Sequence, residues 1–95
     1  MASTLHLIVS GRVQGVGYRD SLRERAIAAG LTGWVRNRSD GTVEAVLQGE
    51  TQAVAAVALW TRQGPPAARV TGVVETPASG EYERPYARFE RLPTA

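Results

Sequence analysis

The feature that most constrains the fold is a glycine-rich turn between two segments of different periodicity near the start of the chain. Residues 5–10 alternate between apolar and more polar side chains, which is typical of a strand. Residues 19–29 are rich in helix formers. Gly11, Gly15 and Gly17 lie between them, and glycine adopts backbone conformations that would strain other residues. The pattern predicts a strand, a tight open loop and a helix in immediate succession.

Both elements present an apolar side. Leu5, Leu7 and Val9 share the more apolar face of the strand. On the helix, the expected buried stripe consists of Leu22, Ala26 and Ala29, and Gly30 is a suitable stop.

A hairpin follows in the sequence. Residues 32–38 and 42–48 are predicted strands, and Ser39-Asp40-Gly41 is the predicted turn, since Asp-Gly before an alternating run favours a hairpin. The second strand should bury Val43, Ala45 and Leu47 on one face.

A second helix is predicted over residues 52–63, with Thr51 as its N-cap and Gly64-Pro65-Pro66 as its end. Its buried stripe has two possible compositions, which are Ala53, Val57 and Trp60 or Val54, Val57 and Thr61. The remaining segments are a strand at 69–76, a surface loop at 77–85 and a last strand or edge segment at 86–92.

The order strand, helix, strand, strand, helix, strand is the split βαβ pattern of ferredoxin-like folds. We therefore expect an α+β protein, a βαββαβ sandwich with two helices on one face of a mainly antiparallel four- to five-stranded sheet. At 95 residues the chain has room for one domain, which we expect over residues 1–95 with flexible ends at 1–4 and 93–95.

Composition excludes several classes of function. The eleven basic residues are all Arg and nearly balance nine acidic ones, so the net charge of +2 argues against general binding of nucleic acid. The absence of cysteine excludes disulfides, a thiolate nucleophile and a zinc finger. No signal peptide or membrane-spanning run is visible, so a cytoplasmic location is expected.

The loop from Gly11 to Arg19 has the chemistry of an anion site. Glycines allow successive N–H groups to point into one concavity, and the following helix directs the positive end of its dipole to the same point. Arg19 lies where the helix begins, so its guanidinium can bond two phosphate oxygens. The spacing is neither that of a P-loop nor that of a dinucleotide fold. Taken alone, the loop is equally consistent with a plain chain turn beside a solvated arginine.

A second motif downstream favours the anion site over the plain chain turn. The run from Gly11 to Arg19 resembles the acylphosphatase signature Gly-x-Val-Gln-Gly-Val-x-Tyr/Phe-Arg at every position. A second signature of the same family, Gly-Trp-Val-x-Asn-x-x-x-Gly-x-Val, is matched downstream by Gly33, Trp34, Val35, Asn37, Gly41 and Val43. The resemblance extends from about Leu5 to Val74, with a weaker match around Phe89, and the tail after Phe89 departs from the family pattern.

The resemblance implies the roles of particular residues. Arg19 and the amides of the loop would hold a phosphoryl group, and Asn37 would orient the attacking water. The amides in question belong to Gln14, Gly15, Val16, Gly17 and Tyr18. The implied reaction is hydrolysis of small acyl phosphates without a metal or other cofactor, with inorganic phosphate as product and competitive inhibitor. We expect a monomer without nucleic-acid or membrane partners, and acetyl phosphate, carbamoyl phosphate and 1,3-bisphosphoglycerate stay open as substrates.

No side chain is an obvious general base. Asp20, Glu24 and Asp40 fit a helix N-terminus, a solvated helix face and a hairpin turn, so substrate phosphate is the expected proton acceptor. His6 fits the less apolar face of the first strand. Trp34 and Trp60 fit packing roles.

Three further residues lie in or beside the motifs. Tyr18 fits the mouth of the pocket. Arg36 and Arg38 flank Asn37 and fit either the attraction of anionic substrates or plain solvation.

Two other functions use the same fold. A non-enzymatic anion-binding or carrier-recognition module would keep the domain without the reaction, but Arg19 and Asn37 are both present. An RNA-binding domain would need aromatic residues on its central strands, and residues 5–10 and 42–48 contain none.

Overall fold

The computed structural model describes residues 1–95, and its elements follow the predicted order. In chain order they are β1 (Ala2–Arg12), α1 (Tyr18–Ala28), β2 (Thr32–Asn37), β3 (Val43–Glu50), α2 (Thr51–Thr61), β4 (Arg69–Pro77), the short 3-10 helix η1 (Gly80–Tyr82) and β5 (Phe89–Arg91). The predicted hairpin joins β2 and β3, and η1 lies in the segment expected to be a loop.

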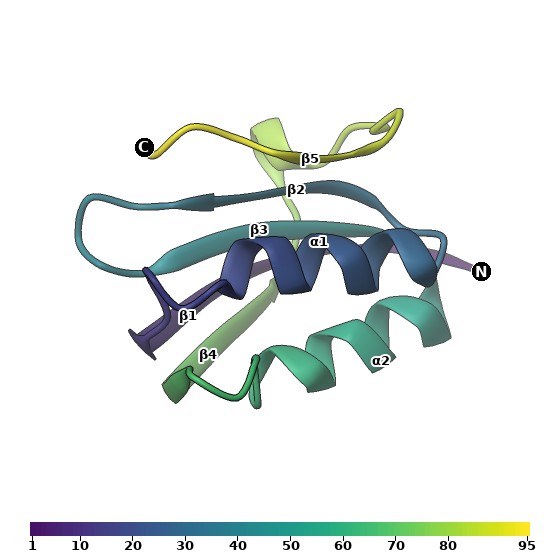
Figure 1. Cartoon of the computed structure of the whole chain (residues 1–95). Coiled ribbons are helices and arrows are strands. Elements are labelled where there is room, and N and C mark those ends of the chain that lie inside the picture. Colours follow the sequence, from purple (N-terminus) through teal and green to yellow (C-terminus); the bar gives the residue numbers. More distant parts are fainter.

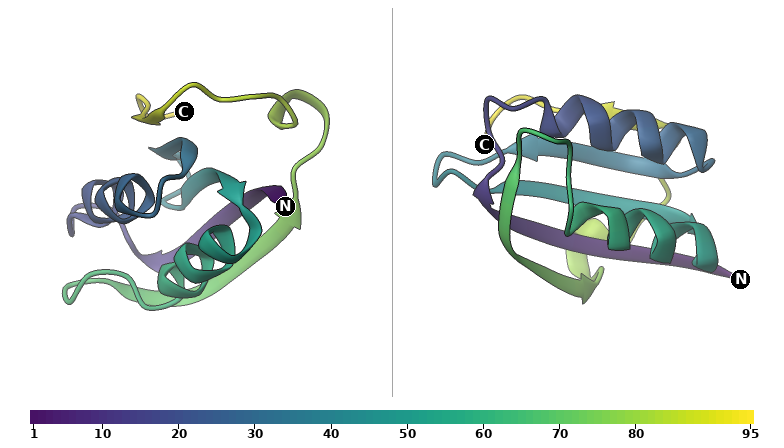
Figure 2. Two further views of the ribbon diagram at one scale, coloured as in Figure 1. Left: turned by 90° about the vertical axis from the view of Figure 1, so that its right-hand side faces the viewer. Right: turned by 60° about the horizontal axis from the view of Figure 1, so that its bottom comes forward.

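The five strands form one sheet in the order β4-β1-β3-β2-β5. All neighbouring strands are antiparallel except β2 and β5, which are parallel. Both helices lie on the same face of the sheet, and the segment that leads from β4 to β5 crosses the other face (Figure 1, Figure 2). This arrangement confirms the expected ferredoxin-like fold.

The core lies between the helices and the sheet. Leu7 and Val9 of β1 are fully buried there, as are Val43, Ala45 and Leu47 of β3. On α1, Leu22 and Ala26 are buried as predicted, but Ala29 is exposed because the helix ends at Ala28.

The second helix buries the stripe that contains Val54, Val57 and Thr61, together with Ala58. The predicted cap of this helix is wrong. Glu50 is the N-cap, and its carboxylate accepts a hydrogen bond of 3.1 Å from the amide of Ala53. The hydroxyl of Thr51 instead lies 2.7 Å from the hydroxyl of Ser3 on β1.

Both ends of the chain make backbone hydrogen bonds to neighbouring segments. Residues 2–4 belong to β1 and pair with residues 48–50 of β3. At the other end, Ala95 donates to the carbonyl of Asn37 and accepts from the amide of Ser39. These contacts use the backbone alone, so side-chain periodicity gives no sign of them.

Candidate functional site

Two of the three glycines shape the loop between β1 and α1. Gly15 and Gly17 have φ of 73° and 78°, while no other type of residue in the chain has a positive φ. The sign of φ therefore alternates from Gln14 to Tyr18, and alternation of this kind turns successive N–H groups into one concavity. A Cβ at either glycine would meet nothing within 4 Å, so the requirement for glycine here is conformational.

Gly11 has a different role from the one predicted. It lies within β1, at a bulge where the pairing with β4 shifts between Ser10 and Gly11. A Cβ there would lie 2.1 Å from the carbonyl oxygen of Arg69. Gly11 therefore allows β4 to approach β1 closely and does not contribute to the concavity.

The amides of the loop have no partner within the protein. No backbone N–H from Gln14 to Asp20 donates to a backbone carbonyl or a side chain, and the first donor along the helix is Ser21, to Gly17. Gly17 is the N-cap of α1 and has no side chain that could cap it. A row of free donors and the positive end of a helix dipole thus meet at one point.

Arg19 stands in the first turn of α1 and is half-buried. Its guanidinium forms no ion pair, although five ion pairs occur elsewhere in the chain. We call the amides of residues 14–18 and the Arg19 side chain the anion cradle. Every charged or polar donor in the cradle is available to a ligand.

The side chain of Gln14 ties the cradle to the β2–β3 hairpin. Its Nε2 donates to the carbonyl oxygens of Arg38 and Thr42, at 2.8 and 2.9 Å. The same two residues close the hairpin, because the amide of Arg38 donates to the carbonyl of Thr42. The sequence resemblance implies a role for the backbone amide of Gln14 only, and nothing in the sequence predicts this use of its side chain.

Asn37 is the last residue of β2, directly before that hairpin turn. It is only 9% exposed, yet its side chain makes no hydrogen bond within the protein, and its Oδ1 is fully buried. Leaving a buried polar atom without a partner costs about 1–3 kcal/mol. An unpartnered carboxamide at a strand end therefore calls for a functional explanation.

The topology brings the cradle and Asn37 to the same end of the molecule. Asn37 pairs with Val43 of β3, and Val43 pairs with Val9 of β1, so the three lie in one row across the sheet. The loop leaves β1 a few residues further on, and Gln14 holds it to the hairpin. The start of α1, the β2–β3 hairpin and the C-terminus all lie at this end (Figure 1, Figure 2).

The acidic residues near the motifs have other partners or none. Asp20 accepts a 2.6 Å hydrogen bond from Arg91, which lowers the pKa of its carboxyl. Asp40 accepts from the hydroxyl and the amide of Thr42, and these bonds lower its pKa as well. Glu24 is exposed and unpaired. None of the three forms a hydrogen bond or an ion pair with Arg19 or Asn37.

The opposite face of the sheet holds a separate polar cluster around Glu44. The carboxylate accepts 2.7 Å bonds from His6 and Arg36, and the ring of Tyr82 stacks on His6. Burial alone would raise the pKa of Glu44, but hydrogen bonds from His6 and Arg36 outweigh it and lower the pKa. Arg36 is therefore engaged away from the cradle, and His6 lies on the predicted face.

Tyr18 is buried and does not line a pocket mouth as expected. Its hydroxyl donates to the carbonyl of Thr61 at 2.7 Å, and burial raises its pKa strongly. A Cβ on Gly64 would lie 2.9 Å from the Tyr18 ring, which explains the glycine after α2. Trp60 packs against the Tyr18 ring, in agreement with its predicted packing role. Tyr18 thus anchors the start of α1 on α2.

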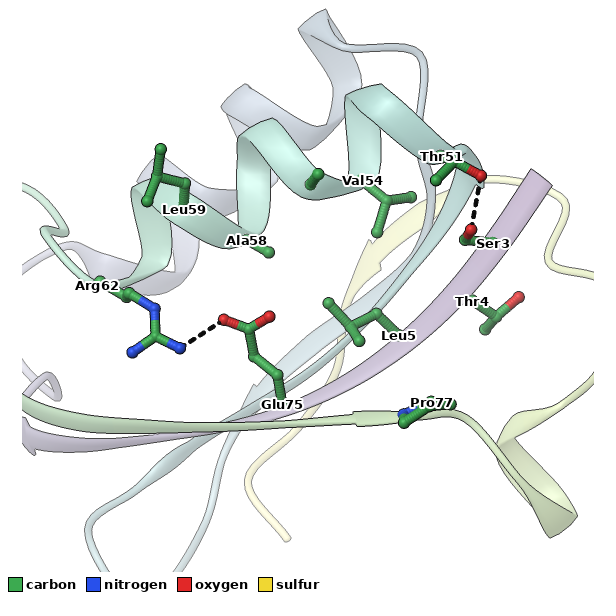
Figure 3. Close-up of a pocket in the computed structure, with 11 residues that line it drawn as sticks. Ser3, Thr4, Leu5, Thr51, Val54, Ala58, Leu59, Arg62, Glu75 and Pro77 are labelled. Atoms are coloured by element: carbon green, nitrogen blue, oxygen red, sulfur yellow. Dashed lines mark hydrogen bonds and ion pairs between the residues drawn. The ribbon is translucent and has the colours of Figure 1, made fainter. Parts of the chain in front are cut away.

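An apolar hollow of about 590 Å³ lies away from this end, between α2, β1 and β4 (Figure 3). Leu5, Val54 and Ala58 line it, and the ion pair of Arg62 with Glu75 closes one side. No group of three His, Cys, Asp or Glu side chains is placed to hold a metal ion. No helix is both long and apolar enough to cross a membrane.

The fold and the candidate site together define a small ferredoxin-like domain with free amides and an unpaired arginine at the start of its first helix. The family model described as acylphosphatase matches residues 5–91, and the chain belongs to the acylphosphatase family.

Individual comparisons agree with this assignment. An acylphosphatase of Thiobacillus denitrificans is 54% identical over 79 residues, which cover 83% of this chain and 89% of the relative. An acylphosphatase structure from Coxiella burnetii is 38% identical, with a TM-score of 0.87, covering 96% of this chain and 93% of that one. Full-length HypF shares the fold, with a TM-score of 0.85 at 22% identity, over 99% of this chain and 12% of that one.

Proposed function

We propose that this protein hydrolyses the carboxyl–phosphate bond of small acyl phosphates, with the anion cradle as the phosphoryl site and Asn37 as the residue that positions water. The observation that carries the proposal is that two sets of groups without protein partners lie at the same end of the molecule. One set is the free amides and Arg19 at the start of α1, and the other is the buried carboxamide of Asn37 at the end of β2. The membership of the chain in the acylphosphatase family supports the choice of substrate class.

The cradle would bind the phosphoryl group through charge and hydrogen bonds. In a loose phosphoryl-transfer transition state, negative charge is spread over the three equatorial oxygens. The amides of residues 14–18 and the Arg19 guanidinium can surround such a group with donors that are already oriented. A hydrogen bond to a charged group contributes about 1.5–3 kcal/mol. Arg19 should therefore dominate both affinity and rate.

Asn37 would hold the nucleophile. Its Oδ1 can accept a hydrogen bond from water, and its Nδ2 can donate one, so the carboxamide can fix the orientation of a water molecule. The oxygen of that water forms the new bond to phosphorus while the bond from phosphorus to the acyl oxygen breaks. The products are a carboxylate and inorganic phosphate.

The reaction requires little general acid–base catalysis from the protein. The leaving carboxylate needs no protonation, and the proton of the attacking water can pass to the phosphate itself. We infer that no metal takes part, because the cradle supplies positive charge, and we expect a plateau of activity around neutral pH. Asp20 and Asp40, whose carboxylates already accept hydrogen bonds, fit this scheme as structural residues.

The same proposal covers the organisation of the protein. Residues 1–95 are taken as one domain that acts as a monomer in the cytoplasm. Inorganic phosphate should compete with substrate for the cradle, since the two share the tetrahedral group that the amides surround.

The test is hydrolysis of benzoyl phosphate in the presence of EDTA. Arg19→Ala should lose at least about 100-fold in turnover and also lose inhibition by inorganic phosphate. Arg23→Ala is the matched control, because Arg23 lies one turn further along α1 and forms no ion pair. Phosphate binding without turnover in the parent protein would favour the non-enzymatic anion-binding module instead.

A further inference from the structure

The segment after β5 continues along β2 and reaches the candidate site. The amide of Leu92 donates to the carbonyl of Val35 at 2.9 Å. Three residues on, the amide of Ala95 donates to the carbonyl of Asn37 at 3.0 Å, and the backbone oxygen of Ala95 accepts from the amide of Ser39 at 2.8 Å. One residue of the segment thus bridges the residues on either side of Arg38.

Beyond β5 these bonds follow the parallel direction of β2 with the register shifted by one residue, because Ala95 lies opposite Arg38. Gly33 pairs with Phe89 and Val35 with Arg91, and a parallel ladder uses donor and acceptor of one residue toward two alternate residues of its partner. Ala95 bonds to Asn37 and Ser39 in this way. Pro93, which has no N–H, lies between the two donors Leu92 and Ala95.

The bonds of Ala95 complete the support of the Asn37 backbone. On the β3 side, Asn37 pairs with Val43, and the following peptide is held by Thr42 and by the side chain of Gln14. On the other side, the segment after β5 supplies the bonds to the carbonyl of Asn37 and to the amide of Ser39. Without it, this end of β2 would be a sheet edge open to water, and such ends open locally at little cost.

The same segment also contacts the other half of the site. Arg91 donates a 2.6 Å bond to Asp20, which is the residue next to Arg19 in the first turn of α1. Both side chains are largely exposed, so the pair contributes little to stability. The position of this ion pair matters more than its energy, because the pair joins the beginning of α1 to the segment that borders Asn37.

We propose that residues 91–95 form a positioning strap, which holds the backbone of Asn37 and the first turn of α1 in the relative placement that hydrolysis requires. The inference rests on the proposed function of Arg19 and Asn37. The strap contacts no substrate itself; it acts by fixing where the carboxamide of Asn37 lies relative to the phosphoryl group. An error of about 1 Å in such placement can lower a rate by about 100-fold.

The test removes the bonds of Ala95 in two ways. Deletion of residues 93–95 removes both bonds, and Ala95→Pro removes only the donor to Asn37 at full chain length. Ala95→Gly, which keeps both backbone groups, is the matched control. With benzoyl phosphate, we expect the deletion to lower kcat by about 10- to 100-fold, and Ala95→Pro to lower it less. Inhibition by inorganic phosphate should stay within about twofold of the parent, because the cradle amides are untouched.

The same deletion in the Asn37→Ala variant distinguishes loss of Asn37 positioning from general damage to the protein. In a protein that already carries Asn37→Ala, deletion of residues 93–95 should lower kcat no further, because there is no carboxamide left to place. An equal loss of kcat in both backgrounds would overturn the proposal. So would an unchanged kcat in the deletion variant.

Hydrogen exchange at the Ser39 amide tests the contact without any reference to activity. The exchange should be slow in the parent and in Ala95→Gly, and fast after the deletion. Fast exchange in the parent would overturn the strap even if the enzyme is active. Slow exchange in a parent without turnover would sink the proposed function, and with it the catalytic role of the strap, while leaving the contact in place.

Discussion

Two buried polar side chains on neighbouring strands of this sheet differ in one respect. Glu44 on β3 is 4% exposed and Asn37 on β2 is 9% exposed. The carboxylate of Glu44 accepts hydrogen bonds from His6 and Arg36, whereas the carboxamide of Asn37 has no partner in the protein. A satisfied buried group stabilises the fold, and an unsatisfied one lowers stability unless a ligand completes it. Under the proposed function, Glu44 serves stability and Asn37 serves the reaction.

The largest predicted change is in the free energy of unfolding when Glu44 is replaced. Glu44→Gln keeps the size of the side chain but removes the charge that binds His6 and Arg36, so the free energy of unfolding should fall by about 2–3 kcal/mol. Urea denaturation measures this change, with the exposed and unpaired Glu24→Gln as control. Turnover of the folded protein should be unaffected. A variant that keeps its stability and loses its activity would reverse the assignment.

The conformation of the cradle predicts a smaller effect. Gly17 has φ of 78°, and a left-handed backbone costs about 1–2 kcal/mol with any side chain bearing a Cβ. Gly17→Ala should therefore lose stability by that amount and also weaken inhibition by inorganic phosphate.

Gly72→Ala is the control for this change. Gly72 has no positive φ, and a Cβ there would meet nothing within 4 Å. If the two variants bind phosphate equally well, the alternating φ of the loop does not shape the anion site.

The pH dependence of stability gives the smallest and most specific signal. The pKa of Glu44 in the folded protein lies below its ordinary value, because the hydrogen bonds from His6 and Arg36 outweigh burial. A depressed pKa contributes stability above the unfolded value, about 4.3, and that contribution disappears as the pH falls through the folded value.

The difference in unfolding free energy between the parent and Glu44→Gln should therefore narrow as the pH falls below about 4. Urea denaturation at a series of pH values measures it. A difference that stays constant down to pH 2 would show that the charge of Glu44 is not what stabilises this face.

The sequence predicts the fold well because the fold depends on side-chain periodicity. The alternation of Val43, Ala45 and Leu47 and the Asp-Gly turn before them correspond to a hairpin in the structure. The predictions that Ala29 is buried and that Thr51 caps α2 were wrong. Both errors concern the terminal residues of a helix, whose position residue type limits only weakly.

For the candidate site, the sequence predicted the conformation of the loop but not the contacts around it. The motif around Gly15 and Gly17 requires positive φ, and both glycines adopt it. The anchoring of Gln14 to the hairpin and the hydrogen bonds of Ala95 join residues far apart in the chain. No spacing or periodicity announces such contacts, because they use one amide side chain and backbone groups.

Asn37→Ala tests the central claim most directly, with turnover of benzoyl phosphate and inhibition by inorganic phosphate measured on the same protein. The account predicts that kcat falls by about 100-fold or more. Phosphate inhibition should stay close to that of the parent, and the unfolding midpoint should not fall, because the carboxamide makes no hydrogen bond within the protein. Ser39→Ala is the control, because it changes a neighbouring side chain that makes no hydrogen bond and leaves the backbone bond to Ala95 in place. Undiminished turnover in Asn37→Ala would contradict the account.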